Sequence, residues 1–277
     1  MSTLYLVATP IGNLEDITLR ALRVLREVPL IAAEDTRQTR KLLERYDIHT
    51  PLTPYHEHNK ARKTPVLLEK LAAGDLALVS DAGTPGINDP GYELVLAAIQ
   101  AGHTVTPVPG PTAPVAALVV SGLPADAFLY LGYLPRKRAE RRARLAEVAS
   151  LPYTLLFLET PHRLRAALDD LLEVLGERRI AIGRELTKMH EEIWRGSLRE
   201  ARARFADTAP RGEFTLVVEG APSTPAAERW PPERLQAAIE ASRAAGEPPS
   251  RAARRLAEAS GWPRREIYAM LTVDGRR

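Results

Sequence analysis

The sequence of 277 residues contains no cysteine. This absence excludes a disulfide-stabilised scaffold, a thiol nucleophile and every zinc or iron–sulfur site that depends on cysteine ligands. It is also typical of proteins that work in a reducing compartment, so a cytoplasmic location is expected. A chain of this length can bury a core without help from disulfides or structural metals.

Long apolar runs are missing too, because none reaches the ~18 residues that a membrane-spanning helix needs. The opening segment MSTLYLVATP carries no basic stretch and has the composition of a strand, so a signal peptide is not expected. We therefore expect no association with a membrane.

Three common phosphate and metal motifs are also absent. There is no G-x-G-x-x-G after a predicted strand, no G-x-x-x-x-G-K-[ST] and no H-E-x-x-H. The six histidines are scattered, and only His56 and His58 lie close together. Because no third ligand is in view, we interpret this pair as polar loop residues and expect no metal site.

The charge is nearly balanced, with 38 basic and 35 acidic residues and a net charge of +3. Residues 133–150 nevertheless contain six basic residues against two glutamates, and residues 251–277 contain seven arginines against three acids. Such segments indicate a polyanionic partner, although two solvated helix faces would give the same pattern. Only six of the basic residues are lysines, so a lysine next to a predicted strand stands out.

Apolar runs and helical periodicity alternate along the first part of the chain, which predicts an α/β fold with a largely parallel sheet. The predicted strands cover 4–8, 30–33, 76–80 and 104–108, and the predicted helices cover 18–27, 36–46, 59–73, 91–101 and 112–121.

A second α/β unit follows. Its predicted strands cover 128–131, 153–158, 179–183, 192–194 and 214–218, and its predicted helices cover 138–149, 162–175 and 198–205. Residues 221–225 have the composition of a linker, and three short helices are predicted after them, at 232–245, 250–260 and 263–271. We therefore expect three domains, covering residues 1–122, 123–221 and 222–277.

Three loops that follow predicted strands have compositions suited to ligand binding. Residues 80–91 hold three glycines, two prolines and two aspartates, and this loop is longer than the ~4–6 residues of an ordinary connection. Residues 8–14 and 109–113 combine proline and glycine, which lets a ligand approach the backbone closely or simply makes a tight turn. In open α/β sheets, ligands bind beyond the carboxyl ends of the strands, where these loops lie.

Charged side chains follow two other strands. Glu34 and Asp35 end the second predicted strand, where they could orient a substrate or cap the next helix. Lys188 follows a later strand, with Glu185 three residues before it. A lysine acts as a base when burial lowers its pKa, whereas a structural Lys–Glu pair is the alternative.

The motifs VATPIGNLEDIT, AEDTR, HEHN, LVSDAGTPGINDPG, PVPGPTA, SGLP, FLETPHR and RELTKMHEEIWRG occur in this order. Together they resemble the tetrapyrrole methylase superfamily, and within it the bacterial 16S rRNA (cytidine) 2′-O-methyltransferase subfamily. The resemblance covers residues 3–220, and the C-terminal helices resemble an extension often found on this subfamily. One departure is Asn88, where the family usually has serine, which is also small and polar.

The resemblance implies a two-domain α/β fold of the tetrapyrrole-methylase type (a class III methyltransferase), with a small C-terminal extension of helix-turn-helix character. It implies S-adenosylmethionine as methyl donor in the cleft between the domains, S-adenosylhomocysteine as product, and a homodimer. Carried over motif by motif, the residues implied to hold the donor are Pro10, Asp81, Gly83, Thr84, Pro85, Ile87, Thr112, Ala113, Leu158, Met189 and Thr215.

The implied reaction is direct methyl transfer to the ribose 2′-oxygen of a cytidine in the decoding centre of 16S rRNA, within the small ribosomal subunit. A general base should help by ~10²–10⁴-fold. The candidates are Lys188, Glu34 and Asp35, with Lys188 slightly favoured, and alanine at Lys188 should abolish transfer while leaving donor affinity nearly intact. The residues implied to contact RNA are Arg37, Asn59, Arg136, Lys137, Arg138 and Arg163.

Two other classes of function compete with this interpretation. A precorrin or other tetrapyrrole methyltransferase would share the fold, but the basic segments, the AEDTR motif and the C-terminal helices argue against it. A non-catalytic nucleic-acid-binding module would have no need of the patterned loop at residues 80–91. Fold alone does not decide the substrate.

Overall fold

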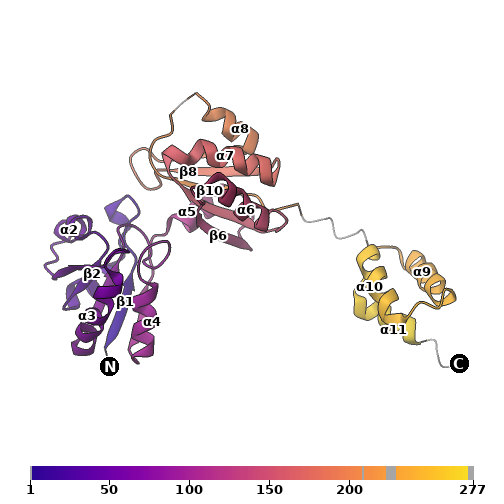
Figure 1. Cartoon of the computed structure of the whole chain (residues 1–277), viewed down its shortest axis with the longest axis horizontal. Coiled ribbons are helices and arrows are strands. Elements are labelled where there is room, and N and C mark those ends of the chain that lie inside the picture. Colours follow the sequence, from indigo (N-terminus) through magenta and orange to yellow (C-terminus); the bar gives the residue numbers. More distant parts are fainter. Residues whose placement is uncertain (1, 208, 223–228, 274–277) are drawn as a thin grey trace. The chain divides into compact units, whose positions relative to one another are not determined.

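The computed structural model of the chain describes residues 2–207, 209–222 and 229–273. It divides into two compact units, Met1–Gly220 and Ala221–Arg277, which are described separately below (Figure 1). Residues 223–225 of the predicted linker lie outside the described residues. No helix in the described part of the chain is both long and apolar enough to cross a membrane.

The first unit opens with a five-stranded sheet in the order β3-β2-β4-β1-β5, with every pair of neighbours parallel. The predicted βα alternation and parallel sheet are thereby confirmed. The strands are β1 (Thr3–Val7), β2 (Ile31–Ala33), β3 (Leu52–Pro54), β4 (Leu76–Val79) and β5 (Thr104–Val108). The helices are η1 (Leu14–Asp16), α1 (Leu19–Glu27), α2 (Thr36–Arg45), α3 (Lys60–Ala73), α4 (Tyr92–Gln100) and α5 (Ala113–Ser121).

Burial and capping explain how this sheet positions its loops. Strands β2 and β4 are buried at every position, as expected for parallel strands covered on both faces. The Thr18 hydroxyl accepts a hydrogen bond from the N–H of Ala21, and the Asp35 carboxylate accepts one from the N–H of Arg37. These caps start α1 and α2 close to the strand ends. Strand β3 was not predicted, because it is short and includes a proline tolerated only at the edge of a sheet.

The second sheet of this unit has the order β6-β7-β10-β8-β9 and is mixed. Only β6 and β7 run parallel, while β10 is antiparallel to both β7 and β8, and β9 is antiparallel to β8. The strands are β6 (Phe128–Tyr133), β7 (Thr154–Glu159), β8 (Arg179–Arg184), β9 (Glu192–Ser197) and β10 (Phe214–Val218). The helices are α6 (Arg138–Val148), α7 (Pro161–Leu175) and α8 (Leu198–Arg204), so the predicted second α/β unit is confirmed.

Helix α5 joins the two sheets through an apolar cluster. Its Ala117 and Leu118 pack in one cluster with Leu156 of β7, Ala181 of β8 and Val217 of β10. The other face of the second sheet is covered by α6, α7 and α8, which enclose a separate core around Phe157 and Leu216 (Figure 1). The carboxyl end of β7 therefore lies close to the start of α5, where a site can form.

The second unit consists of α9 (Pro232–Ala244), α10 (Pro249–Ser260) and α11 (Arg264–Val273), which confirms the three predicted C-terminal helices. Leu235, Ile239, Leu256 and Ile267 are buried in a core of its own. Gly261 ends α10 in the left-handed conformation, with φ of 66°, and turns the chain toward α11. This unit therefore has a closed core without contribution from the first.

Candidate active site

A cavity of about 230 Å³ lies where loops of the first sheet face strand ends of the second. The first sheet contributes the loop after β4, and the second contributes the ends of β6, β7 and β10. A second, adjoining cavity of about 460 Å³ is lined by the loop after β1, by α2 and by Lys188. Because both cavities share Ile11, Asp81, Ala82 and Glu213, they form one continuous site region.

The loop after β4 is held in place by backbone pairing. The N–H of Thr9 donates to the carbonyl of Gly83 at 2.9 Å, and the N–H of Gly83 donates back at 3.0 Å. Gly83 has φ of 80°, a conformation that favours glycine. At the other end of the loop, a Cβ atom on Gly132 of β6 would overlap the Asn88 side chain. The loop is therefore fixed between the two sheets.

The loop after β1 also needs a glycine. A Cβ atom on Gly12 would come within 2.5 Å of Lys188 Cγ and 2.9 Å of the Leu186 carbonyl oxygen. The N–H of Asn13 donates to the Thr187 hydroxyl at 3.0 Å. The turn after β8 is thus docked directly on the loop after β1, which brings Lys188 to the cavity wall.

Eight of the eleven residues predicted to hold the methyl donor line the first cavity. They are Asp81, Gly83, Thr84, Ile87, Thr112, Ala113, Leu158 and Thr215. Pro10 lines the adjoining cavity, and Pro85 lines neither. Met189 does not reach the site either, because its side chain is 94% exposed. Its neighbour Lys188 is the side chain that the turn directs toward the cavity, so Met189 is not in a position to pack against a bound ring.

Two carboxylates of the cavity have raised pKa values. Burial raises the pKa of Glu34, and a hydrogen bond from the N–H of Asp81 at 3.3 Å only partly offsets this. Burial, together with the nearby charge of Glu34, raises the pKa of Asp89 to about 7. An acid with such a pKa exchanges protons readily near neutral pH.

Asp35, in contrast, does not line either cavity. Its carboxylate accepts hydrogen bonds from the side chain and the backbone N–H of Arg37, which lower its pKa to about 2. Asp35 therefore caps helix α2, which is the alternative role that the sequence suggested for it. A carboxylate this acidic is a weak proton acceptor.

Lys188 lies between two glutamates. Its Nζ is 3.0 Å from an oxygen of Glu185 and 3.0 Å from an oxygen of Glu213. Burial alone lowers the pKa of Lys188, but the hydrogen bonds to these two carboxylates outweigh it, and the pKa is raised. This is the opposite of the lowered pKa that a lysine base requires, so Lys188 is a protonated ammonium group here.

Several residues that line the first cavity were not among the predicted site residues, and Asp89, Tyr133 and Glu159 are three of them. Asp89 belongs to the loop after β4, Tyr133 ends β6 and Glu159 ends β7. Two of them could have been found from the sequence, since Asp89 lies in the loop at residues 80–91 and Glu159 lies in the motif FLETPHR. Tyr133 carried no pattern of its own.

Three of the residues predicted to contact RNA have exposed side chains that make no ion pair or pair with a single acidic residue. Arg136 makes no ion pair with any residue that the structure describes. Arg37 pairs with Asp35, and Lys137 pairs with Glu140 at 3.0 Å, in contacts open to solvent. Exposed pairs of this kind exchange easily for a phosphate, because they contribute little stability.

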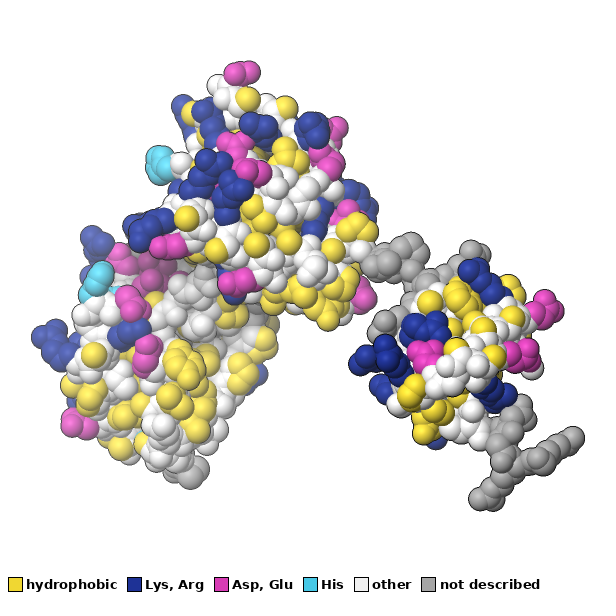
Figure 2. All heavy atoms as spheres, turned by 45° about the vertical axis from the view of Figure 1, so that its right-hand side comes forward, with side chains coloured by type: hydrophobic (Ala, Val, Ile, Leu, Met, Phe, Trp, Pro, Cys, Tyr) yellow, Lys and Arg dark blue, Asp and Glu magenta, His cyan; other side chains and the backbone are white. Residues whose placement is uncertain are grey.

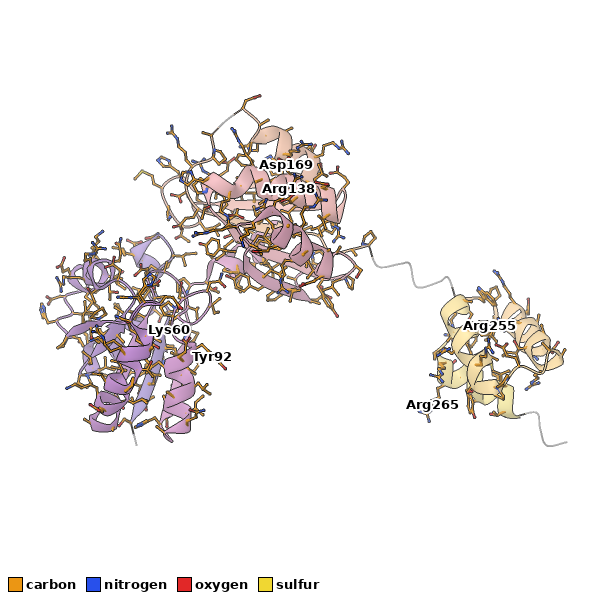
Figure 3. The ribbon with its side chains drawn as sticks, viewed as in Figure 1. Lys60, Tyr92, Arg138, Asp169, Arg255 and Arg265 are labelled. Atoms are coloured by element: carbon orange, nitrogen blue, oxygen red, sulfur yellow. The ribbon has the colours of Figure 1, made fainter. Side chains whose placement is uncertain are left out.

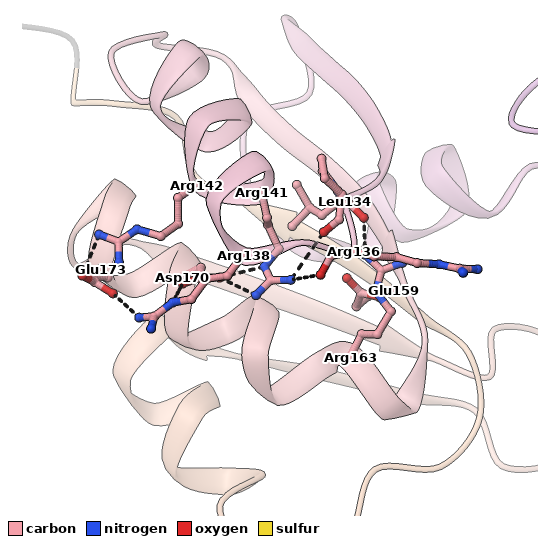
Figure 4. A network of polar contacts seen from close by, with 10 residues as sticks. Leu134, Arg136, Arg138, Arg141, Arg142, Glu159, Arg163, Asp170 and Glu173 are labelled. Atoms are coloured by element: carbon pink, nitrogen blue, oxygen red, sulfur yellow. Dashed lines mark hydrogen bonds and ion pairs between the residues drawn. The ribbon is translucent and has the colours of Figure 1, made fainter.

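The other three are occupied within the protein. Arg138 bonds to two acidic residues of α7 (Figure 4). Arg163 donates to the Leu134 carbonyl and its Nε lies 3.3 Å from Glu159, with only 22% of its side chain exposed. Asn59 holds the turn before α3 through the N–H of residue 56 and the carbonyl of residue 54. Arg163 is therefore held by groups within the protein instead of presenting a free charge.

No group of three or more His, Asp or Glu side chains arranged to hold a metal ion occurs among residues 2–207, 209–222 and 229–273. The rings of His56 and His58 are in edge contact, with centroids 6.1 Å apart.

The chain matches the family model of the Tetrapyrrole (Corrin/Porphyrin) Methylases over residues 3–202. It is 49% identical to the ribosomal RNA small subunit methyltransferase I of Halalkalibacterium halodurans over 269 residues, covering 96% of this chain and 93% of that protein. It is also 49% identical to the protein of the same name from Synechocystis, covering 99% and 100% of the two chains.

Solved structures of more distant proteins share the fold. The methyltransferase CobJ superposes with a TM-score of 0.59 at 22% identity, covering 80% of this chain and 95% of its own. Uroporphyrin-III C-methyltransferase from Thermus thermophilus, in complex with S-adenyl homocysteine, superposes with a TM-score of 0.55 at 23% identity, covering 78% and 97%. These structures support the predicted two-sheet fold.

Proposed function

The chain belongs to the tetrapyrrole methylase family, and on that premise we propose that it methylates the ribose 2′-oxygen of a cytidine in the decoding centre of 16S rRNA. The methyl donor is S-adenosylmethionine, as in the family. The observation that carries the rRNA substrate is the 49% identity, over nearly the full chain, to two methyltransferases named for the small-subunit rRNA. The assignment of a cytidine as the target, and of its 2′-oxygen as the methyl acceptor, rests on the series of sequence motifs given above.

The cavity suits this donor. Thr112 makes no side-chain cap at the start of α5, so the first-turn N–H groups remain available to the donor's carboxylate. The Tyr130 hydroxyl is buried in the cavity wall and has no hydrogen-bond partner among the described residues. Thr84 and Thr215 offer further hydroxyl groups, and Leu158 offers an apolar wall. The donor supplies an electrophilic methyl group on a sulfonium.

The protein's own task is to align the ribose oxygen with that methyl group and to accept its proton. Near-attack geometry requires ~3–3.5 Å between the reacting atoms, which a loop fixed between two sheets can maintain. Among the cavity carboxylates, Asp89 is the best proton acceptor because its pKa lies near neutral pH, and Glu34 is the second. We therefore assign the base to Asp89, with Glu34 as its neighbour.

A homodimer is part of this proposal. The exposed face of α4 carries Tyr92, Leu96 and Ile99 at helical spacing, and Tyr92 projects away from the helix (Figure 3). Helix α5 also exposes Val115 and Val119. Apolar side chains spaced along one helix face are typical of surfaces that a second chain covers. Analytical ultracentrifugation of the full chain tests this, since a monomer at micromolar concentration would contradict it.

For Lys188→Ala the structure changes the expected result. Because its glutamate partners stabilise the protonated form of the lysine, we expect the transfer rate to fall by less than the ~10²-fold that loss of a general base costs at minimum. The dependence of the rate on pH should keep its shape. Single-turnover methyl transfer between pH 6 and 9 measures both, and complete loss of transfer with unchanged donor affinity would restore Lys188 as the base.

The proposed function is tested by transfer of labelled methyl groups from S-adenosylmethionine to small ribosomal subunits from cells that lack this protein, with naked rRNA in parallel. Label in the ribose of a cytidine is the expected result, and preference for subunits would indicate that assembled shape is recognised. Label in a precorrin or other tetrapyrrole, with none in either RNA, would move the activity to the alternative substrate class.

A further inference from the structure

The second cavity has few of the residues predicted to hold the methyl donor. Only Pro10 and Asp81 of those eleven residues line it, and Asp81 is shared with the first cavity. The second cavity is nevertheless the larger of the two, at about 460 Å³ against about 230 Å³. Direct displacement requires the acceptor oxygen to approach the methyl group from the side opposite the sulfur, so donor and acceptor need adjoining spaces.

The proposed base lies where the two cavities meet. Asp89 lines the first cavity, and its carboxylate interacts with the Ser80 hydroxyl, which lines the second. A ribose in the second cavity therefore has the proposed base at its boundary with the donor.

Helix α2 forms part of the wall of the second cavity and presents a cation there. Its lining residues are Gln38, Thr39, Lys41 and Leu42. The ammonium group of Lys41 donates to the side-chain oxygen of Gln38 at 3.0 Å and makes no ion pair with any residue that the structure describes. Lys188, the other lysine of this wall, is already paired with two glutamates. Lys41 is therefore the lysine of this cavity that is available to an anion.

A second cation follows one turn later on the same side of α2. Arg45 lies four residues after Lys41, about 6 Å further along the helix. Its side chain is exposed, and its guanidinium carbon lies 5.7 Å from the centroid of the Tyr46 ring, with no carboxylate partner among the described residues. Arg40 is rotated by ~100° around the helix from Lys41 and lines neither cavity. Two cations one turn apart suit contacts with successive phosphates of one RNA strand.

The loop after β1 adds an apolar surface to the same cavity. Leu14 lines the cavity although 38% of the residue is exposed. The Tyr46 hydroxyl donates to the Leu14 carbonyl at 2.7 Å, which ties this loop to the end of α2. An exposed leucine held in this way can pack against the apolar part of a nucleoside.

Resting on the proposed function, we propose that the second cavity binds the target nucleotide, with its ribose beside Leu14, the adjoining phosphate on Lys41 and the next phosphate on Arg45. Contacts with phosphates fix the register of a strand without reading its bases. Lys41 and Arg45 are then binding residues that determine which ribose reaches the donor, and no proton moves through them.

The variant Lys41→Gln tests this contact through binding of small subunits from cells that lack the protein. We expect the dissociation constant to rise about fivefold to tenfold at low salt, and the slope of log affinity against log salt to decrease by about 0.7–0.9. The single-turnover rate at saturating subunits should change less than about twofold, because a phosphate contact is made equally in the ground state and the transition state. Lys41→Arg keeps the charge and should retain most of the affinity, and Arg45→Gln should shift affinity and slope in the same direction as Lys41→Gln.

Arg40→Gln is the matched control, since it removes the same charge from the neighbouring position of α2 and should change the dissociation constant less than about twofold. Equal shifts in Arg40→Gln and Lys41→Gln would indicate a diffuse charge effect and overturn the proposal, as would an unchanged salt slope in Lys41→Gln. A loss of S-adenosylhomocysteine affinity in Lys41→Gln as large as the loss of subunit affinity would assign the second cavity to the donor. Subunit affinity is measured by filter binding without methyl transfer, so failure of the wild type to label subunits would refute the proposed function separately.

Discussion

Asp89→Asn is expected to lower the single-turnover rate of methyl transfer by ~10²–10⁴-fold, because asparagine cannot accept the proton of the ribose hydroxyl. Asp89 lines the cavity on the loop after β4, and burial raises its pKa to about 7. The amide is nearly the same size as the carboxylate, so affinity for the product S-adenosylhomocysteine, whose sulfur carries no charge, should change little. The two measurements together separate a loss of chemistry from a loss of binding.

The pH dependence gives a second readout. Asp89 acts as a base only when ionised, so the wild-type rate should rise with pH through about 7 and level off above it. The residual activity of Asp89→Asn should lack this step. Asp126→Asn, an exposed aspartate in the loop before β6, serves as the matched control and should keep both rate and profile. Retention of the neutral step in Asp89→Asn would transfer the role of base to Glu34.

The same substitution should stabilise the fold. The native pKa of Asp89 is about 7 and its unperturbed value is 3.8, so the native state binds the proton more tightly than the unfolded state does. The free energy of unfolding therefore decreases as pH rises from about 4 to about 7. Asparagine removes this loss, and the gain in stability over the wild type should be larger at pH 8 than at pH 5 in urea titrations. A variant that loses activity while gaining stability cannot owe its defect to misfolding.

Much of the architecture was predictable because local patterns and tertiary packing agree. The fully apolar strand β4 and the capped helix α2 are examples in which sequence composition and burial give the same answer. Strand β3 was not predicted, because it depends on pairing with β2 at the sheet edge and has no apolar pattern of its own.

The side-chain chemistry was less predictable, because it depends on partners distant in sequence. The raised pKa of Lys188 depends on Glu213, 25 residues away, as well as on Glu185, which is the only partner that sequence spacing shows. Arg163 looked like an RNA contact, but the carbonyl of Leu134 and the carboxylate of Glu159 turn it inward. Loops that bind through backbone groups leave a compositional trace, whereas a change in protonation does not.

The C-terminal unit is expected to supply a large part of the affinity for RNA. Four of its arginines, on α10 and α11, make no ion pair within the described part of the chain: Arg251, Arg254, Arg264 and Arg265. Arg255, in contrast, pairs with Glu247 at 2.7 Å. Figure 2 shows dark blue side chains on the surface of this unit, and Figure 3 labels Arg265 at its edge. Arginines without carboxylate partners can bind phosphates without first breaking an ion pair within the protein.

Replacing these four arginines by serine should weaken binding to small subunits by about tenfold to a hundredfold and reduce the slope of log affinity against log salt by about 3. Removal of residues 224–277 should have at least this effect, while S-adenosylhomocysteine affinity stays unchanged because no residue beyond Gly220 lines the described cavity. Serine at Arg20, Arg40, Arg62 and Arg165, exposed helix positions of the first unit, is the matched control and removes the same charge. Equal losses in both sets would indicate a diffuse charge effect, and equal loss of subunit and S-adenosylhomocysteine binding on truncation would give the C-terminal helices a role in folding instead of in RNA recognition.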